Sequence, residues 1–338
     1  MMNEIYGFQN TRKEVMQSSS GGAFIALCKA FEKLYAGNTV FCGAAFDSEM
    51  NVVHKCVESL EECKIFKGSK YVKSRCEIQK MNLDLAVQRG KHVFFSGTPC
   101  QINALNQYIE KQNLPRQMFI TVDVICHGAP KVEFWNAYRK WLEMRNGSKI
   151  TEYSFRYKPE GWKAYPAFVR FENGKTLVNT AETSVYSKMH MARYSIGKGC
   201  FSCPYAKEER ISDITLGDYW GVEKVFPDLE YKRGVSLVLV HSQQGQELVK
   251  TIGQSRDVFL QKTTDESYLQ FQHNLRKPTE CPEGYEKFWD DFAQMPFENI
   301  LNKYIGYGRK YCIMHQIKKI VRKTPFIEWY RDRRKNGR

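Results

Sequence analysis

The sequence predicts an α/β fold of mixed type, in which an N-terminal region of alternating helices and strands packs on a second mixed region and a helical tail follows. Helix-like and strand-like apolar patterns alternate through the first 150 residues, strands joined by a hairpin signal come next, and the last 30 residues are strongly basic. A chain of 338 residues can bury one large core or two modest ones. We therefore expect three parts: residues 1–150, 151–308 and 309–338.

The first part alternates between helix and strand. Apolar residues at spacings of three and four predict its first helix. Thr98 is a typical N-cap and Pro99 a typical first helical residue, so another helix should begin there. The elements expected in this part are a helix over 23–34, strands over 39–46 and 52–57, a helix over 78–88 that stops at Gly90, a strand over 92–96, a helix over 99–110, a strand over 119–125 and a helix over 130–146.

The pattern changes after Ile150. Asn173-Gly174 is the residue pair that two-residue hairpins prefer, and it lies between two strand-like runs. Pro296 should interrupt the last long helical pattern. The elements expected in this part are strands over 153–157, 166–172 and 175–179, a helix over 182–194, a short strand between Asp213 and Asp218, a strand over 235–241, a helix over 244–252 and a helical stretch over 285–304.

The composition is that of a globular protein, with 42% hydrophobic and 14% aromatic residues. Residues 1–12 lack the apolar segment of a secretory signal, and no apolar run approaches the roughly 20 residues that cross a bilayer. We therefore expect a cytoplasmic protein whose eleven cysteines are mostly reduced thiols or metal ligands. The odd cysteine count argues against a disulfide framework.

The net charge of +14 is concentrated at the C-terminus. Residues 309–338 contain eleven Lys and Arg against Glu328 and Asp332, which leaves +5 for the other 308 residues. Because the body of the chain lacks a large basic surplus, we expect no nucleic-acid partner.

Four cysteines stand where a folded chain could bring them together. Cys200 and Cys203 form a Cys-x-x-Cys-Pro motif, and Cys100 and Cys126 each follow an apolar, strand-like run. Four thiolates from such turns can hold an iron–sulfur cluster. Zinc is the main alternative, but four-Cys zinc sites usually bring two Cys-x-x-Cys pairs and this chain has one. Each cysteine taken alone could also be a buried free thiol.

The other seven cysteines carry no motif. Cys28 falls on an expected helix, and Cys42 and Cys56 fall within expected strands, so we interpret these three as small apolar core residues. No role is assigned to Cys63, Cys76, Cys281 and Cys312.

Three polar segments could bind an anion. The run from Ser18 to Gly22 opens a helix, where free N–H groups and glycine favour an anion, although an ordinary serine cap is the alternative. Residues 67–74 interleave three lysines with Gly, Ser and Tyr, a pattern that suits a dinucleotide's phosphates or a solvated loop. Arg156 and Lys158 could act similarly or form a polar strand edge.

His127, next to Cys126, is a candidate proton donor or hydrogen-bond partner at a redox centre, or a structural histidine in a tight turn. Asp213 and Asp218 flank a short strand close to the Cys-x-x-Cys motif in sequence, and they suggest the wall of a site.

The tail predicts a basic amphipathic helix. Ile313, Ile317, Ile320 and Val321 share one helical face, and Phe326, Trp329 and Tyr330 follow Pro325. Such a helix can lie on an anionic membrane surface or dock on a partner, and a solvated helix packed on its own domain is the alternative.

Six ordered motifs resemble those of the coenzyme F420 hydrogenase/dehydrogenase beta subunit family, over roughly residues 17 to 300. They are Ser-Ser-Gly-Gly at 19–22, Lys-Gly-Ser-Lys-Tyr-Val at 67–72, Gly-Thr-Pro-Cys-Gln at 97–101, Cys-His-Gly at 126–128, Phe-Arg-Tyr-Lys with Gly-Trp at 155–162, and Cys-x-x-Cys-Pro with Ser-Asp-Ile-Thr-Leu-Gly-Asp-Tyr-Trp-Gly at 200–221.

This resemblance implies an iron–sulfur flavoprotein that passes electrons between FAD, a [4Fe–4S] cluster and a second substrate. That substrate is a deazaflavin in the methanogen enzymes and a pigment in plant relatives, and similar bacterial proteins occur among polysaccharide-synthesis functions. The implied cluster ligands are Cys100, Cys126, Cys200 and Cys203. The implied FAD contacts are Ser20, Gly21, Gly22, Lys67, Ser69, Lys70 and Tyr71, with His127 as the catalytic candidate.

Many relatives carry an N-terminal ferredoxin-like segment with two four-Cys runs, and this sequence has no cysteine before Cys28. We therefore expect a separate ferredoxin or partner redox subunit, or a direct hydride donor, beside a small-molecule redox substrate. The cluster should join the two main parts of the chain. Alternative functions are a non-catalytic electron-transfer subunit and a zinc-stabilised binding protein. The expected location is the cytoplasm, with peripheral inner-membrane contact through the tail.

Overall fold

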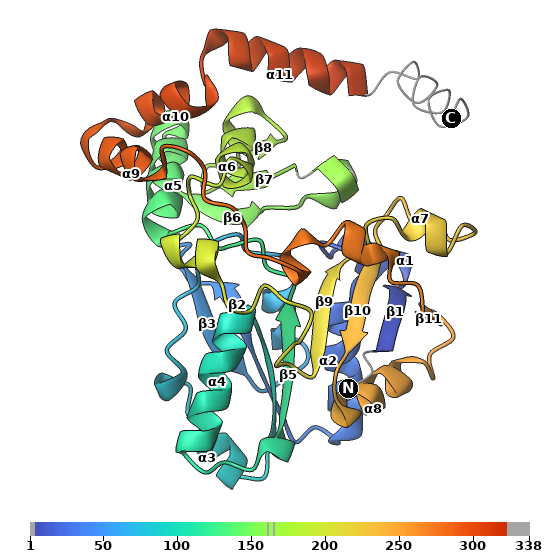
Figure 1. The fold of residues 1–338 in the computed structure, drawn as a ribbon. Coiled ribbons are helices and arrows are strands. Elements are labelled where there is room, and N and C mark those ends of the chain that lie inside the picture. The colour runs from blue at the N-terminus through green and yellow to red at the C-terminus, as the bar shows by residue number, and fades with distance from the viewer. Residues whose placement is uncertain (1–3, 161, 165, 323–338) are drawn as a thin grey trace.

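A computed structural model describes residues 4–160, 162–164 and 166–322. Figure 1 shows a large sheet with its covering helices in the lower half and a smaller sheet with a group of helices above it. The helices are α1 Arg12–Met16, α2 Ala23–Leu34, α3 Leu83–Gln88, α4 Pro99–Lys111, α5 Val132–Asn146, α6 Ala181–Met191, α7 Val222–Val225, α8 Gln243–Ile252, α9 Tyr285–Gln294, α10 Phe297–Ile305 and α11 Arg309–Arg322.

The large sheet has eight strands in the order β11-β1-β10-β9-β5-β4-β2-β3. Its centre is parallel, because β2, β4, β5 and β9 run the same way, whereas the outer strands pair antiparallel. The strands of this sheet are β1 Glu4–Gln9, β2 Thr39–Phe46, β3 Val52–Val57, β4 His92–Gly97, β5 Phe119–Val124, β9 Ile214–Asp218, β10 Ser236–Val240 and β11 Phe259–Thr263.

Helices cover both faces of this sheet. On one face α2 packs beside α8, and a cluster that includes Phe31, Phe41 and Phe94 fills the space beneath them. On the other face α3 and α4 cover Val93, Phe95 and other buried residues of the strands. The α2 apolar face arises from its three-and-four spacing, as the sequence predicts, and burying it provides most of the stability of such a helix.

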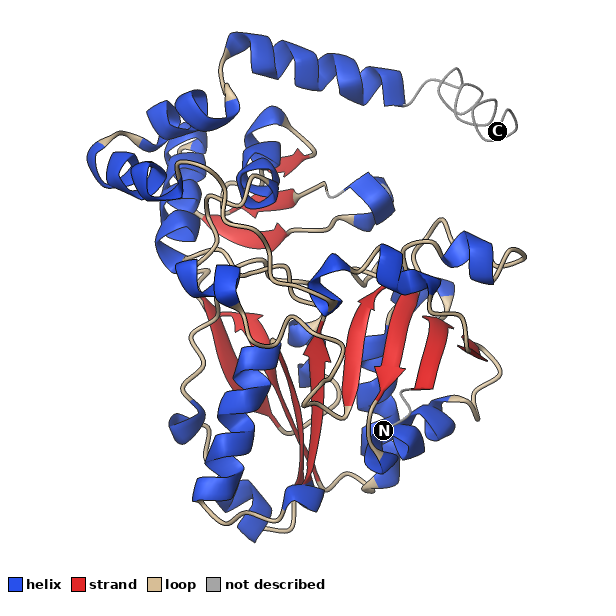
Figure 2. Cartoon of the chain, in the orientation of Figure 1, coloured by secondary structure: helices blue, strands red, loops and turns tan. Residues whose placement is uncertain are grey.

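The upper part combines a three-stranded antiparallel sheet with the helices α5, α6, α9 and α10 (Figure 2). Its strands are β6 Ile150–Ser154, β7 Phe168–Phe171 and β8 Thr176–Val178. Trp135, Tyr138 and Tyr186 are fully buried and contact one another in tilted and edge-to-face arrangements, with 5.0 to 6.0 Å between ring centroids. The helix α11 extends from this part along the upper end of the molecule.

The α/β class and most of the expected elements are confirmed. Thr98 caps α4 in a capping box with Gln101, and Gly147 ends α5 in the left-handed conformation, with a φ of 60°. The segment 285–304 divides into α9 and α10 at Pro296.

Several boundaries differ from the prediction. The helix expected over 78–88 is a short 3₁₀ turn followed by α3, because Asn82 takes a left-handed φ of 53° between them. The helix expected over 182–194 ends at Met191, and the strand expected over 153–157 lies earlier, at 150–154. The strands β1 and β11 are additional to those predicted. The strands β9, β10 and β11 return to the sheet formed by the first 150 residues.

The interpretation of Cys42 and Cys56 as free core thiols is wrong. A disulfide joins them, because β2 and β3 pair antiparallel and place these two residues directly opposite one another. Nine cysteines remain free. Among the residues that the structure describes, none of the helices is both long enough and apolar enough to traverse a lipid bilayer.

Candidate functional site

The four motif cysteines lie beyond the carboxyl ends of the central strands. Cys100 stands in the first turn of α4, directly after β4, and Cys126 follows β5. Cys200 and Cys203 lie in and just after a 3₁₀ turn over Lys198–Ser202. The carboxyl ends of parallel strands form the usual ligand-binding edge of an α/β sheet. The chain therefore brings both halves of the predicted site to that edge.

The turn after Cys126 packs directly against the Cys200 turn. Gly128 has a φ of +97°, and a Cβ there would lie 2.6 Å from Ile196 and 3.3 Å from the Cβ of Cys200. The backbone N–H of Gly197 donates to the carbonyl of Ala129 at 3.1 Å. This close approach requires glycine at 128, since any side chain would separate the two turns.

The thiols are electrostatic neighbours. Burial raises the pKa of Cys126 to about 12, and Cys200, Cys100 and Cys203 each add to that rise. The pKa of Cys200 is also raised, first by burial and then by Cys100 and Cys203. Backbone hydrogen bonds from Gly128 and Ala129 oppose these shifts and so favour thiolates. The four thiols are therefore close enough that ionisation of one disfavours ionisation of the others.

The backbone N–H groups of Gly128 and Ala129 donate to the sulfurs of Cys126 and Cys200, and the Cys100 side chain is exposed. Within the described ranges, no three His, Cys, Asp or Glu side chains are grouped closely enough to hold a single metal ion.

A hydrogen-bonded chain fixes the Cys100 turn. The Thr98 hydroxyl lies 3.1 Å from the Cys100 sulfur, and the Gln101 amide donates to Ser74 at 2.8 Å. Ser74 in turn lies 2.8 Å from Nδ1 of His54, whose Nε2 lies 3.0 Å from the carbonyl oxygen of Ser96. Neutral His54 satisfies both contacts, with Nδ1 accepting and Nε2–H donating.

A buried ion pair anchors the loop that follows Cys203. Arg210 and Asp123 are almost completely buried and lie 2.6 Å apart. The same guanidinium donates to the carbonyl oxygen of Tyr205 at 2.9 Å. Since Asp123 belongs to β5, this pair ties the Cys-x-x-Cys loop to the strand that leads to Cys126.

His127 lies in the turn after Cys126, which packs against the Cys200 turn. Its carbonyl accepts from the Thr279 hydroxyl at 2.8 Å. Desolvation lowers the pKa of its ring, although the side chain keeps exposed surface. Neutral imidazole can donate or accept a hydrogen bond here.

A cavity of about 550 Å³ brings together the three polar segments that the sequence analysis considered separately. It lies between loops above the large sheet and the strands β6 and β7, within the size range of small-molecule sites. Its polar and charged lining residues are Gln17, Ser18, Ser19, Lys67, Ser69, Lys70, Glu152, Ser154, Arg156, Tyr157 and Lys158.

Two lysines of this cavity form no ion pair with a carboxylate among the described side chains. Lys70 donates to the carbonyls of Ile65 and Lys67, and Lys158 donates to the carbonyl of Ser20. Desolvation lowers the pKa of each lysine to about 7. A buried cation that only backbone oxygens satisfy gains when an anion arrives.

Other charges in the cavity are paired. Lys67 lies 2.8 Å from Glu14, and Arg156 lies 2.5 Å from Asp218. Asp218 also accepts from the Trp162 indole at 2.8 Å, so it holds both Arg156 and Trp162, while its place in the wall of a site beside the cysteines stays a prediction. Asp213 does not belong to the wall, because it lies at the other end of β9 and accepts from Thr121 at 2.7 Å.

The predicted cofactor residues divide into two groups. Lys67, Ser69 and Lys70 line the cavity, whereas Ser20, Gly21, Gly22 and Tyr71 are not among its lining residues. A Cβ on Gly21 would lie 2.2 Å from the carbonyl oxygen of Phe8, so this glycine permits close packing against β1. The sequence analysis missed Phe46 and Phe168 in the lining; Phe46 ends the parallel strand β2, which was the available signal.

Tyr71 connects the cavity loop with the cysteine turns. Its ring lies 5.3 Å from that of His190, and His190 Nε2 lies 3.2 Å from the carbonyl oxygen of Gly128. Tyr186 donates to the Tyr71 carbonyl at 2.6 Å. Tyr71 and His190 thus link the loop of the cavity to the turn that follows Cys126.

Comparison with known proteins gives a family match and structural likenesses. Residues 90–266, more than half of the chain, match the family model that describes the C terminus of the coenzyme F420 hydrogenase/dehydrogenase beta subunit. No curated protein sequence matches. A solved structure titled as a xenon derivative of the F420-reducing [NiFe] hydrogenase complex from Methanosarcina barkeri is similar at a TM-score of 0.51 and 18% identity, over 80% of this chain and 86% of that one. At this identity the likeness concerns the fold.

Proposed function

The chain belongs to the coenzyme F420 hydrogenase/dehydrogenase beta subunit family, and from this premise we propose that it is an FAD- and [4Fe–4S]-dependent oxidoreductase. One observation carries the proposal: four thiols with backbone donors to two of their sulfurs are connected, through His190 and Tyr71, to the loop of a cavity with two lysines that lack a carboxylate partner among the described side chains. The first feature suits a thiolate-bound cluster and the second suits a dinucleotide.

The donor set supports an iron–sulfur cluster over zinc. Cys100, Cys126, Cys200 and Cys203 would be its ligands. Hydrogen bonds to the sulfurs are typical of cluster sites, because they compensate the thiolate charge. Four-Cys zinc sites usually bring two Cys-x-x-Cys pairs, and this chain has one.

The cavity supports a ligand with phosphates and a flat ring. Lys70, Lys158 and Ser69 would hold the phosphates, because all three line the cavity and carry hydrogen-bond donors. Phe46 and Phe168 offer apolar surface for a ring system. A bound flavin supplies hydride exchange on one side and single-electron exchange on the other.

The residues of the chain then have defined tasks. The Arg156–Asp218 pair and the Trp162 indole fix the wall of the cavity, and the Arg210–Asp123 pair holds the Cys203 loop in place. His127, at the junction of both turns, would donate a hydrogen bond or proton at the redox centre. The proposed partners are a separate ferredoxin or redox subunit and a small redox substrate, a deazaflavin or one linked to polysaccharide synthesis, in the cytoplasm.

Anaerobic purification followed by metal, sulfide and flavin analysis tests the proposal. We expect flavin absorbance and about four iron and four sulfide per chain. Cys203→Ser should remove the iron–sulfur absorbance, while Cys281→Ser, a control on an exposed cysteine outside the motif set, should keep it. A colourless protein with one zinc would contradict both cofactors.

The alternative is an electron-transfer subunit that has no substrate of its own. The isolated chain should oxidise a reduced deazaflavin or nicotinamide with an artificial acceptor if it is an enzyme. A protein that holds both cofactors yet shows no turnover with either donor would favour the subunit.

A further inference from the structure

The helix α11 has two unlike faces. Tyr311, His315 and Lys319, four residues apart, face the protein: the Tyr311 hydroxyl lies 2.7 Å from Ser184, His315 Nε2 lies 3.0 Å from the Asn179 carbonyl oxygen, and Lys319 donates to the Val178 carbonyl at 2.9 Å. Lys188 of α6 lies 4.1 Å from the Tyr311 ring centroid. These contacts hold α11 on α6 and β8 and so fix which face points outward.

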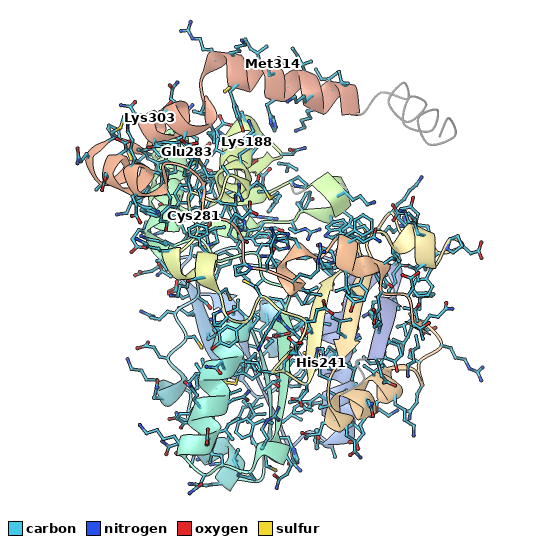
Figure 3. The ribbon with its side chains drawn as sticks, in the orientation of Figure 1. Lys188, His241, Cys281, Glu283, Lys303 and Met314 are labelled. Carbon is cyan, nitrogen blue, oxygen red and sulfur yellow. A yellow bond between two sulfur atoms is a disulfide. The ribbon has the colours of Figure 1, made fainter. Side chains whose placement is uncertain are left out.

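The outward face is apolar. Ile313, Ile317 and Ile320 are 60%, 47% and 64% exposed, and Met314 and Val321 beside them are also exposed. Residues two positions apart on a helix differ by roughly 200° in direction. Ile313 and the isoleucines that share its face therefore point away from Tyr311 and the face that contacts the protein. Met314 lies at the upper end of the molecule in Figure 3, with Lys188 beneath it. Three isoleucines in one exposed row form an apolar stripe that a partner surface could cover.

The charge of this segment selects its partner. Residues 309–322 contain five Lys and Arg and no Asp or Glu. A second copy of α11 placed stripe to stripe would bring two cationic helices together, and like charges repel. An anionic lipid surface accepts both the apolar stripe and the positive charge.

We propose that α11 lies in the plane of an anionic lipid bilayer, with Ile313, Ile317 and Ile320 between the lipids. This surface function is independent of the redox proposal. Lys310 and Lys318 are exposed, so their ammonium groups can reach lipid phosphates at the rim of the stripe. Because α11 is at the opposite end of the upper part from the large sheet, the protein would stand on the membrane with its sheet directed into solution (Figure 1).

Vesicle flotation of the full-length protein tests this. The probes are phosphatidylcholine vesicles with and without about 30% phosphatidylserine. We expect binding only to the anionic vesicles, and loss of most of that binding when salt is raised to about 1 M. A variant with Ile313→Ser, Ile317→Ser and Ile320→Ser should bind about tenfold less, since lipid affinity scales with buried apolar area.

The control variant carries Met144→Ser and Met191→Ser, which remove exposed apolar side chains elsewhere. It should bind vesicles as the unchanged protein does, and all variants should keep the same thermal midpoint because these side chains are exposed. Equal flotation of the triple serine variant, or equal binding to neutral vesicles, would overturn the proposal. A dimer in solution that the triple serine variant abolishes would overturn it in favour of a second copy.

Discussion

The cysteine turns and the basic cavity differ in how their charges are balanced. Around the turns, Arg210 has Asp123, and both nitrogens of His54 have partners. In the cavity, the partners of Lys70 and Lys158 among the described residues are backbone carbonyls. The turns can therefore keep their shape without a ligand. In the cavity, desolvation of the two lysines costs free energy, and an incoming anion would offset that cost.

The largest expected effect removes the anchor of the cysteine turns. Asp123→Ala leaves Arg210 buried without its partner, which should lower the free energy of unfolding by about 3–5 kcal/mol. Urea unfolding measures the change. Glu152→Ala is the matched control, because its partner Arg170 is exposed and the loss should stay below about 1 kcal/mol. Similar losses in the two variants would mean that the turns are not held by this pair.

Acid should loosen the same region through His54. Desolvation lowers the pKa of His54 from 6.5 to about 4. Between these two pH values His54 is therefore protonated in the unfolded chain and neutral in the folded chain. Stability should therefore fall as the pH drops from 6.5 towards 4, by about 3 kcal/mol. His54→Gln should remove this part of the pH dependence in thermal unfolding curves; an unchanged slope would contradict it.

Reduction of the Cys42–Cys56 disulfide should have a smaller effect. The bridge closes a loop with a sequence separation of 14, for which we expect about 2 kcal/mol. Unfolding with and without reductant measures it. A variant with Cys42→Ala and Cys56→Ala should be insensitive to reductant, and sensitivity in that variant would assign the effect to other thiols.

The smallest expected effect concerns the cavity. Desolvation lowers the pKa of Lys70 and of Lys158 to about 7, so both lysines lose protons as the pH rises through 7. The affinity for ADP-ribose, a diphosphate probe, should fall about tenfold from about pH 6.5 to about pH 8.5. Calorimetric titration measures it. Lys158→Met should bind more weakly at the low pH and flatten the dependence; a steep dependence in that variant would leave Lys158 without a role.

Local signals allowed much of the fold to be predicted. The α4 helix was found because Thr98 and Pro99 define its start chemically, and the break between α9 and α10 because Pro296 cannot continue a helix. The edge strand β11 was not predicted, because Phe259–Thr263 is half-exposed and has little apolar character. Asn82 broke an expected helix because its left-handed conformation is decided by surrounding packing rather than by local sequence.

The individual motifs of the site could be predicted from the sequence, but the contacts that bring them together could not. The places of Cys100 and Cys126 after strands and the Cys-x-x-Cys motif of Cys200 and Cys203 led to the expectation that the four converge, although their role as ligands stays a prediction. The cavity depends on contacts such as that between Lys158 and Ser20, which are 138 residues apart, and no local pattern encodes such a pairing. The disulfide was missed because the register of β2 on β3 decides which residues face one another.

The place of β1 in the large sheet has a consequence during synthesis. Both partners of this strand, β10 and β11, lie at the far end of the chain, so Ile5 and Phe8 have no strand to pair with until roughly 230 further residues have been added. At about 5–20 residues per second, this delay on the ribosome is on the order of 10–50 s. During that time the nascent chain exposes an unpaired, half-apolar strand of the kind that chaperones bind and that other chains can capture. The strand β1 is therefore synthesised long before both of its final neighbours.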